Sequence, residues 1–112
     1  MVSLDDFKKL EIRIGQIISA EKVPDTDKLL RLTVDFGEEV PRQIISGISA
    51  FFPNPQALVG KKCAFAANLE PRTIKNLESQ GMILAVSGEN NGQSFFSLLE
   101  TSSEVIPGSP VK

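Results

Sequence analysis

Residues 30–36 alternate without a break between apolar and polar side chains, and this pattern constrains the fold more than any other feature of the sequence. The apolar positions are Leu30, Leu32, Val34 and Phe36, and the polar positions are Arg31, Thr33 and Asp35. Successive side chains of a β-strand point to opposite faces, so the alternation predicts a strand with one buried face and one exposed face.

Four further stretches have the composition of strands. In residues 11–23, four apolar side chains share one face: Ile12, Ile14, Ile18 and Ala20. Gly15 lies inside this strand, where glycine usually marks a bulge or a sharp bend. The other stretches, separated by turn signals, are residues 42–48, 61–69 and 80–88. Two prolines and a later glycine predict an irregular loop before residue 61 that enters one helical turn over Gln56 to Val59.

The order of these elements is three strands, a short helix and two more strands. It is the order of an all-β OB-fold, a five-stranded Greek-key barrel with its helix between strands three and four. Residues 93–100 and 104–112 would add C-terminal strands, and Ser3 would cap a short helical turn over residues 4–10. With 112 residues and 41% hydrophobic content, we expect a single domain over residues 1–112.

The cysteine and histidine content excludes several kinds of chemistry. One cysteine cannot form an internal disulfide, and without histidine the chain offers neither a zinc cluster nor an imidazole base. Cys63 lies among apolar neighbours and is predicted to be an inert core thiol. We therefore expect no enzymatic activity and no cofactor. No stretch resembles a membrane span or a signal peptide, which predicts a cytoplasmic location.

Positive charge is concentrated in the middle of the chain. The net charge of −2 disfavours a general nucleic-acid binder, but residues 41–82 hold five Lys or Arg against two Asp or Glu. In an OB-fold, the ligand face consists of strands two and three with the loops that join strands one to two and four to five. The basic side chains expected there are Lys28, Arg31, Arg42, Arg72 and Lys75.

Several segments resemble a known family, in order and over nearly the whole chain. The most specific is NLEPRTIKNLESQGMILA at residues 68–85, which combines N-L-x-P, two basic residues and S-Q-G-M. Together with DDFKKLEIRIGQI, DKLLRLTVDFG, RQIISGI and the closing IPGS, it is similar to the tRNA-binding domain family. That family includes the appended C-terminal domain of many methionyl-tRNA synthetases, free-standing structure-specific tRNA-binding proteins and the core of endothelial monocyte-activating polypeptide II. One difference is Asn76, where the family often carries glycine.

The resemblance implies a homodimer that grips the outside corner of tRNA by its backbone with little sequence preference, free-standing or as an accessory to methionyl-tRNA synthetase. It adds four candidate contacts: Asn68, Ser79, Gln80 and Met82. From the residues alone, Asn68 could equally stabilise a turn, Ser79 could cap one, and Met82 alternates with Leu84 and Val86 as a core residue would. The absence of Trp and Tyr independently favours structured RNA over single strands, which bind by stacking on aromatic side chains.

Paired phenylalanines suggest where two subunits would meet. Phe51-Phe52 and Phe95-Phe96 each place neighbouring rings on opposite faces if extended, so one ring of each pair would be exposed. We expect a dimer joined through the N-terminal turn and the segment after residue 88. Two other functions stay open. A close branch of the family resembles a dimeric chaperone for extended polypeptides, and the chain could act mainly as a dimerisation module of a synthetase.

Overall fold

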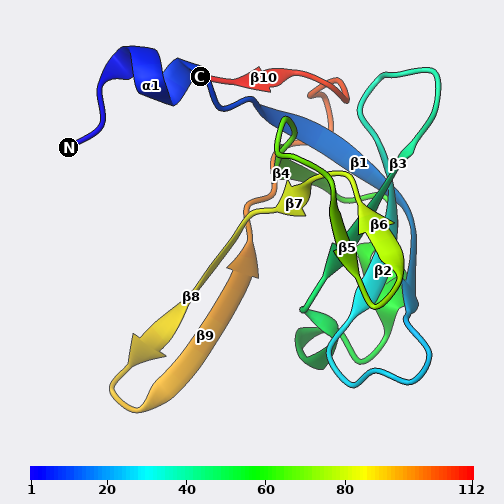
Figure 1. Cartoon of the computed structure of the whole chain (residues 1–112). Coiled ribbons are helices and arrows are strands. Elements are labelled where there is room, and N and C mark those ends of the chain that lie inside the picture. The colour runs from blue at the N-terminus through cyan, green and yellow to red at the C-terminus, as the bar shows by residue number, and fades with distance from the viewer.

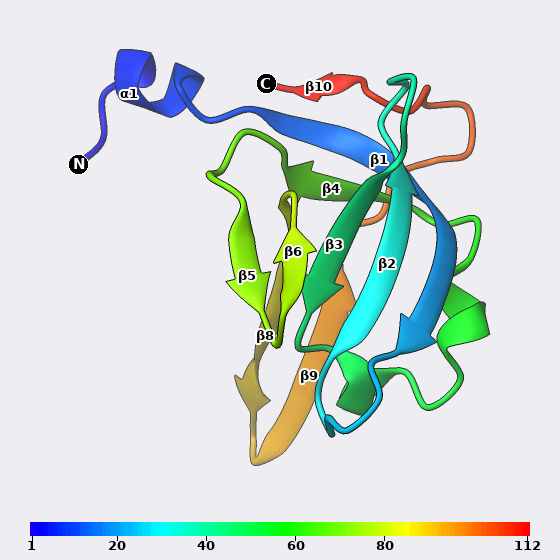
Figure 2. The ribbon, with the colours of Figure 1, turned by 45° about the vertical axis from the view of Figure 1, so that its right-hand side comes forward.

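Strand β2 (Leu30–Asp35) shows the alternation that the sequence predicts, with Leu30, Leu32 and Val34 fully buried and the side chains between them half-buried. The computed structural model describes residues 1–112. β2 lies between β1 (Ile12–Lys22) and β3 (Arg42–Ser46), and β1 also pairs with β4 (Lys62–Ala66), which pairs with β7 (Met82–Ile83). These antiparallel strands curl into a half-barrel (Figures 1 and 2), which confirms the predicted all-β, OB-like fold.

Strand β1 serves both sides of the barrel. Its first part pairs with β4 and its second part with β2, and its register on β2 shifts between Ile17 and Ser19. The sequence places Ile18 on the core face of the strand, and this prediction is wrong. Because of the register shift, Ile17 is buried instead and Ile18 is 47% exposed. The register shift lies after Gly15, which itself stands where β1 passes from β4 to β2. A Cβ at Gly15 would lie 2.5 Å from Val34 Cγ1, so packing also favours glycine there.

Two 3-10 turns, η1 (Ser49–Phe51) and η2 (Pro55–Leu58), connect β3 to β4 where the sequence predicts a short helix. The expected helical turn is present in η2, one residue earlier than predicted. The Asn54 side chain caps η2 by accepting a hydrogen bond from the Gln56 amide at 3.2 Å. Leu58 is fully buried, so η2 contributes to the core.

The core contains the thiol that the sequence places there. Cys63 is fully buried, and burial raises its pKa to about 11. The thiol therefore stays protonated at neutral pH. Phe36 and Phe65 meet edge to face beside it in the same cluster, with their ring centroids 5.2 Å apart.

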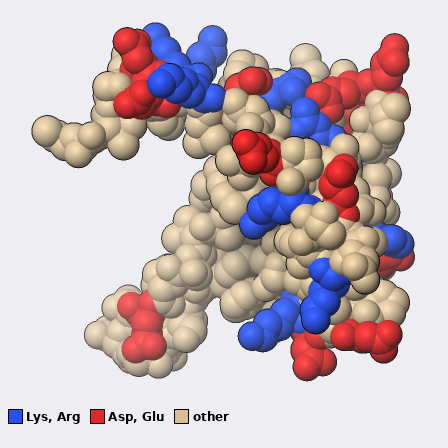
Figure 3. All heavy atoms as spheres, in the orientation of Figure 1, with Lys and Arg blue, Asp and Glu red and all other residues tan.

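Two elements project from the barrel on the same side (Figure 1). One is α1 (Leu4–Lys8), which Ser3 caps as predicted and in which no residue is buried. The other is a separate two-stranded hairpin of β8 (Ala85–Asn90) and β9 (Gln93–Leu98). The surface between them is concave and carries few charged side chains (Figure 3).

This hairpin corrects the prediction of one continuous fifth strand over residues 80–88. Only β7 stays on the barrel, and β8 leaves it to pair with β9. The expected core alternation is wrong here as well, because Ile83 is buried while Met82 and Val86 are 39% and 46% exposed. A strand that leaves the sheet after two paired residues cannot carry one burial pattern through its length.

The C-terminal segment returns to the start of β1. It ends in β10 (Pro110–Val111), which pairs with Ile12 and Arg13 of β1. Lys62 Nζ fastens this segment by donating to the carbonyl oxygens of Ser103 and Val105 at 2.6 and 2.7 Å. No helix in the structure has the length and apolar character needed to cross a membrane.

Candidate nucleic-acid interface

The connection that carries Arg72 and Lys75 is itself a β-hairpin and not the plain loop that the sequence predicts. Strand β5 (Arg72–Ile74) pairs with β6 (Leu77–Ser79). Lys75 and Asn76 form the turn between them, with φ angles of 51° and 67°. Two successive left-handed residues are typical of a type I′ turn, in which asparagine and glycine are preferred. Asn76 therefore suits the position where the resembling family often has glycine.

Strand β6 lies along the open edge of β3, where side chains complete the hydrogen bonding. The Gln43 amide donates to Gln80 Oε1, and the Ile45 amide donates to Ser79 Oγ, each at 3.0 Å. The Gln80 amide in turn donates to the Gln43 carbonyl at 2.8 Å. Unpaired amides at a sheet edge are unfavourable when buried and invite pairing with other chains. The S-Q part of the S-Q-G-M motif thus covers the β3 edge of the half-barrel.

Ser79 has an internal role in this closure. Its side chain is 1% exposed, and its hydroxyl also donates to the Gly81 carbonyl at 2.9 Å. A buried hydroxyl that makes its hydrogen bonds inside the protein has no free surface for a ligand, so the predicted RNA contact of Ser79 is not part of the interface proposed below. Gly81 has a φ of 150°, and a Cβ there would lie 2.9 Å from Ile44 Cδ1, so the position favours glycine.

Arg42, another predicted RNA contact, is turned into the protein at the base of the β5–β6 hairpin. Its Nε and Nη2 donate to the two carboxylate oxygens of Glu38, each at 2.8 Å. Its Nη1 donates to the carbonyl oxygens of Ala67 and Gln80 at 2.5 and 3.3 Å. The guanidinium also lies over the Phe36 ring, 5.1 Å from its centroid. Only 21% of the side chain is exposed, which leaves little of it for a phosphate.

The carboxylate of Glu38 joins two arginines. The hydrogen bonds from Arg42 hold the pKa of Glu38 below its usual value, and Arg13 Nη1, 3.6 Å from Glu38 Oε2, acts in the same direction. Glu38 in turn raises the pKa of Arg42. Ion pairs of Glu38 therefore connect the β2–β3 connection to β1 and to the start of β3.

The substitution Glu38→Gln is expected to reduce the stability of the fold in a pH-dependent way. At pH 7 the loss should be no more than about 1 kcal/mol, because 36% of the side chain is exposed and solvent screens the pair. A carboxylate with a lowered folded-state pKa stabilises the fold above its unfolded-state pKa of about 4.3, and this contribution disappears as the pH falls through the folded-state value. Urea unfolding of both proteins at pH 7 and at about pH 3 measures the change. An equal difference at both pH values would contradict an ion-pair origin.

Asn68 fastens the N-terminal segment to the end of β4. Its Oδ1 accepts from the Glu11 amide at 2.7 Å, and its Nδ2 donates to the Lys9 carbonyl at 2.6 Å. The sequence predicts an amide that stabilises a local turn, whereas in the structure Asn68 joins two segments that are more than 50 residues apart in sequence. Asn68 is also exposed, so its contact with RNA stays a prediction.

Four basic residues lie on the β5–β6 hairpin, at the end of β1 or in the β1–β2 connection, and we call them the basic cluster: Lys22, Lys28, Arg72 and Lys75. All four are exposed, and none makes an ion pair. Lys28 and Lys75 line a hollow of about 380 Å³ between the two segments, together with Asp25 and Asp27. Acidic and basic side chains therefore lie close together at this end of the molecule (Figure 3). Lys8, Lys62 and Lys112 also make no ion pair, so the distinguishing property of the cluster is that its unpaired cations lie on or next to the two segments that border this hollow.

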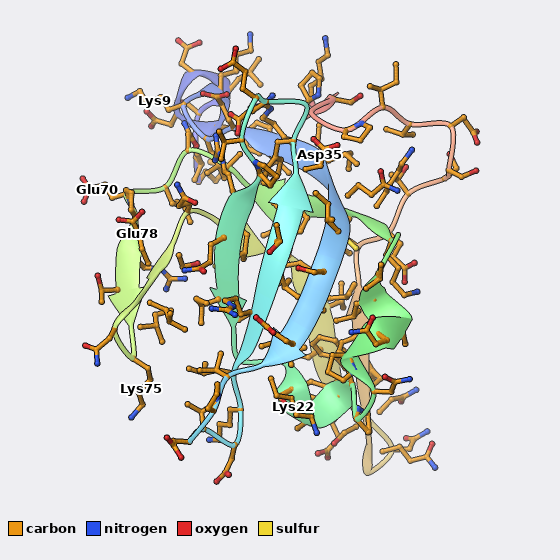
Figure 4. All side chains as sticks on the ribbon, turned by 90° about the vertical axis from the view of Figure 1, so that its right-hand side faces the viewer. Lys9, Lys22, Asp35, Glu70, Lys75 and Glu78 are labelled. Carbon is orange, nitrogen blue, oxygen red and sulfur yellow. The ribbon has the colours of Figure 1, made fainter.

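The base and the tip of the hairpin differ in charge, and Arg72, which pairs with Ser79, lies at the base with the acidic residues. Glu70 and Glu78 lie towards its base, whereas Lys75 lies at its tip (Figure 4). Lys22 lies at the same end of the molecule as Lys75 (Figure 4). Lys22 is absent from the sequence-predicted contacts. Its place as the last residue of β1, directly before the connection that carries Lys28, is the signal that identifies it.

The remaining predicted contacts, Arg31, Gln80 and Met82, differ in how free their side chains are to meet a ligand. Arg31 forms an ion pair with Glu21, its partner across the β1–β2 ladder, so its charge is partly neutralised. Arg31 and Lys22 both line a second, smaller hollow of about 110 Å³ with Leu77 of the hairpin. Met82 is 39% exposed and therefore accessible. RNA contacts by Arg31, Gln80 and Met82 stay predictions.

Known proteins are similar to this chain in sequence and in architecture. The family described as "Putative tRNA binding domain" matches residues 12–110. A methionine–tRNA ligase of Xylella fastidiosa is 46% identical over 111 residues, which are 99% of this chain and 15% of that enzyme. A MetRS-related protein from Pyrococcus horikoshii has a TM-score of 0.88 and 38% identity, covering 100% of this chain and 98% of the other. The chaperone CsaA from Bacillus anthracis has a TM-score of 0.82 and 28% identity, covering 100% and 99%.

These similarities extend over the barrel and both projecting elements, since the two solved structures are matched over the whole of this chain. The chain spans only about 15% of the length of the methionine–tRNA ligases that it matches. From the OB-like fold and the match over residues 12–110, the chain belongs to the tRNA-binding domain family and is homologous to the tRNA-binding domain of methionyl-tRNA ligase.

Proposed function

We propose that this chain binds folded tRNA through its sugar-phosphate backbone, with little preference for sequence, and that it does so as a cytoplasmic homodimer. It would act without catalysis, free-standing or as an accessory to methionyl-tRNA synthetase. The observation that carries the proposal is the basic cluster, four exposed cations without ion pairs on a protein whose net charge is −2. Unpaired cations on an acidic protein attract phosphates to one place and orient the encounter.

The aromatic side chains support folded RNA over single strands. Proteins that bind single strands stack bases on exposed aromatic rings, but the one aromatic residue in the β2–β3 part of the sequence, Phe36, points into the core and is 1% exposed. The exposed rings Phe7, Phe51 and Phe95 belong to α1, η1 and β9, and none lies on β2 or β3. Lysine and arginine contacts to phosphates position an RNA without reading its bases. This chemistry supports recognition of tRNA by shape.

Two elements that cannot bury their own apolar side chains support the homodimer. The helix α1 has five residues and no buried side chain, and Leu4 and Phe7 on one of its faces are 66% and 46% exposed. The β8–β9 hairpin leaves Val86 and Phe95 exposed, and an isolated two-stranded hairpin is marginal in water. As the sequence predicts, one ring of each phenylalanine pair is exposed, namely Phe51 at 51% and Phe95 at 49%. A second copy would cover both elements by two-fold symmetry.

A chaperone is the second candidate function. It is favoured by the likeness to the chaperone CsaA of Bacillus anthracis and by the exposed apolar side chains of the β8–β9 hairpin. The basic cluster speaks against a groove for extended polypeptides, because such a groove needs exposed apolar side chains where this chain has lysine and arginine. A role as dimerisation module of a synthetase would use the same projecting elements without the cluster.

Competition binding with two RNAs tests the proposal. Unfractionated folded tRNA should displace a labelled tRNA at lower concentration than an unstructured oligonucleotide of equal length and charge. The reason is that a site without stacking aromatics recognises the fixed spacing of phosphates and 2′-hydroxyls in a folded RNA. Equal displacement by both would show that the site responds to charge alone.

A further inference from the structure

The β5–β6 hairpin carries half of the basic cluster and is attached to the barrel by side-chain contacts instead of by strand pairing. Its strands have three residues each, and the hairpin pairs with no other strand of the sheet. Its strand β6 is attached to β3 through the hydrogen bonds of Gln43 and Ile45 described above, and Gln43 Nε2 also donates to the Glu78 carbonyl at 2.8 Å. The position of Arg72 and Lys75 therefore depends on what fixes the two ends of residues 68–79.

One nitrogen contacts both ends of that segment. Arg42 Nη1 donates to the carbonyl of Ala67, directly before residue 68, and to the carbonyl of Gln80, directly after residue 79. The rest of the guanidinium is held by the bidentate contact with Glu38 and by its place over Phe36. A bidentate arginine–carboxylate contact fixes the guanidinium in orientation as well as in position.

We propose that Glu38 and Arg42 form a clamp that positions the β5–β6 hairpin for RNA binding, and that Arg42 acts as a positioning residue without contacting a phosphate. This inference rests on the proposed function, since it assigns a role within the same RNA site. Glu38 belongs to the β2–β3 connection and touches no residue of the basic cluster. Its effect on RNA binding is therefore transmitted through Arg42 to the hairpin base.

Because Glu38 is negatively charged, the clamp and simple electrostatics predict opposite effects on tRNA binding when this side chain is removed. Removing a carboxylate from an acidic protein should, by electrostatics alone, strengthen its attraction for RNA. The clamp predicts the opposite for Glu38→Ala, which should weaken tRNA binding by about three- to tenfold. The matched control is Glu39→Ala, which removes the same charge from the next residue, where no ion pair is made. Glu39→Ala should bind tRNA as tightly as the parent or slightly more tightly.

The substitution Arg42→Lys distinguishes a positioning role of this residue from a direct contact with phosphate. Lysine keeps the positive charge but cannot form the bidentate contact with Glu38 while bonding two carbonyls. A phosphate contact would survive this change, whereas the clamp would be lost. We therefore expect Arg42→Lys to match Glu38→Ala in affinity, and both to keep the parent's slope of log affinity against log salt concentration, because no phosphate contact is removed.

Hydrogen exchange of the free protein tests the clamp without RNA. In Glu38→Ala and Arg42→Lys, amides of residues 68–80 should exchange faster than in the parent, while those of β1 and β2 keep their protection. Unchanged exchange in residues 68–80, or tRNA affinity equal to that of the parent despite faster exchange, would overturn the inference. Failure of the parent itself to bind tRNA would overturn the proposed function instead, and the exchange of residues 68–80 would still report on the clamp.

Discussion

Replacing both Arg72 and Lys75 with alanine is expected to weaken tRNA binding by an order of magnitude or more and to leave the melting temperature nearly unchanged. Both side chains are exposed and make no ion pair, so the fold loses little when they are truncated. Each phosphate contact that is lost also removes about one unit from the slope of log affinity against log salt concentration. In a two-fold dimer, the loss would be larger if both copies touch one tRNA.

A matched control tests whether the loss of affinity is specific to the β5–β6 hairpin. Lys61→Ala combined with Lys112→Ala removes the same charge from residues outside the β5–β6 hairpin and the β1–β2 connection. Lys61 makes only a surface ion pair with Glu100, which contributes little to stability. The control should retain most of the affinity and the parent's salt slope. If the Arg72 and Lys75 variant binds as the parent does while the control is weakened, the hairpin is not the site of RNA binding.

The second large effect concerns the association of two chains. Light scattering at micromolar concentration should return roughly twice the chain mass of 12.2 kDa. Leu4→Glu combined with Phe7→Lys should convert the dimer to a monomer, because it places charges on the exposed apolar face of α1. The two charges suit the helix itself, with the acid in the first turn and the base in the last.

The corresponding control for the dimer is Val40→Glu. Val40 is 72% exposed in the β2–β3 connection, which lies away from α1 and the β8–β9 hairpin (Figure 1). Its replacement introduces a charge at an exposed apolar residue and should leave the dimer intact. A parent protein that scatters as a monomer, or a dimer that survives the change in α1, would contradict the proposed interface.

The alternation of apolar and polar residues in the sequence correctly predicted a strand that pairs regularly along its whole length. The alternation in residues 30–36 predicted β2 because one face of that strand meets the core throughout its length. The same reasoning failed at Ile18, where the register shift in β1 reverses the faces, and at Met82, where the chain leaves the barrel. Irregularities of pairing depend on the neighbouring strands and are not visible in one strand's sequence.

Some residues of the candidate site could be predicted from the sequence and others could not. Lys28, Arg72 and Lys75 could be found from the sequence because exposed cations in loops have few structural roles. The internal roles of Ser79 and Arg42 could not, because they depend on distant partners, such as Ile45, which is 34 residues from Ser79. The hairpin itself was hidden because its strands are only three residues long and its turn lacks the Asn-Gly pair that best signals one.

The central claim is that this domain holds folded tRNA and not extended polypeptide. It is tested most directly by an electrophoretic shift of the parent protein with unfractionated tRNA, in the presence of increasing amounts of an unfolded polypeptide. Because exposed cations attract phosphates, the complex with labelled tRNA should form and should persist in excess polypeptide. Unlabelled folded tRNA should displace the labelled tRNA from it. A protein that fails to shift tRNA, or whose complex is displaced by the polypeptide, would contradict the claim and favour the chaperone function.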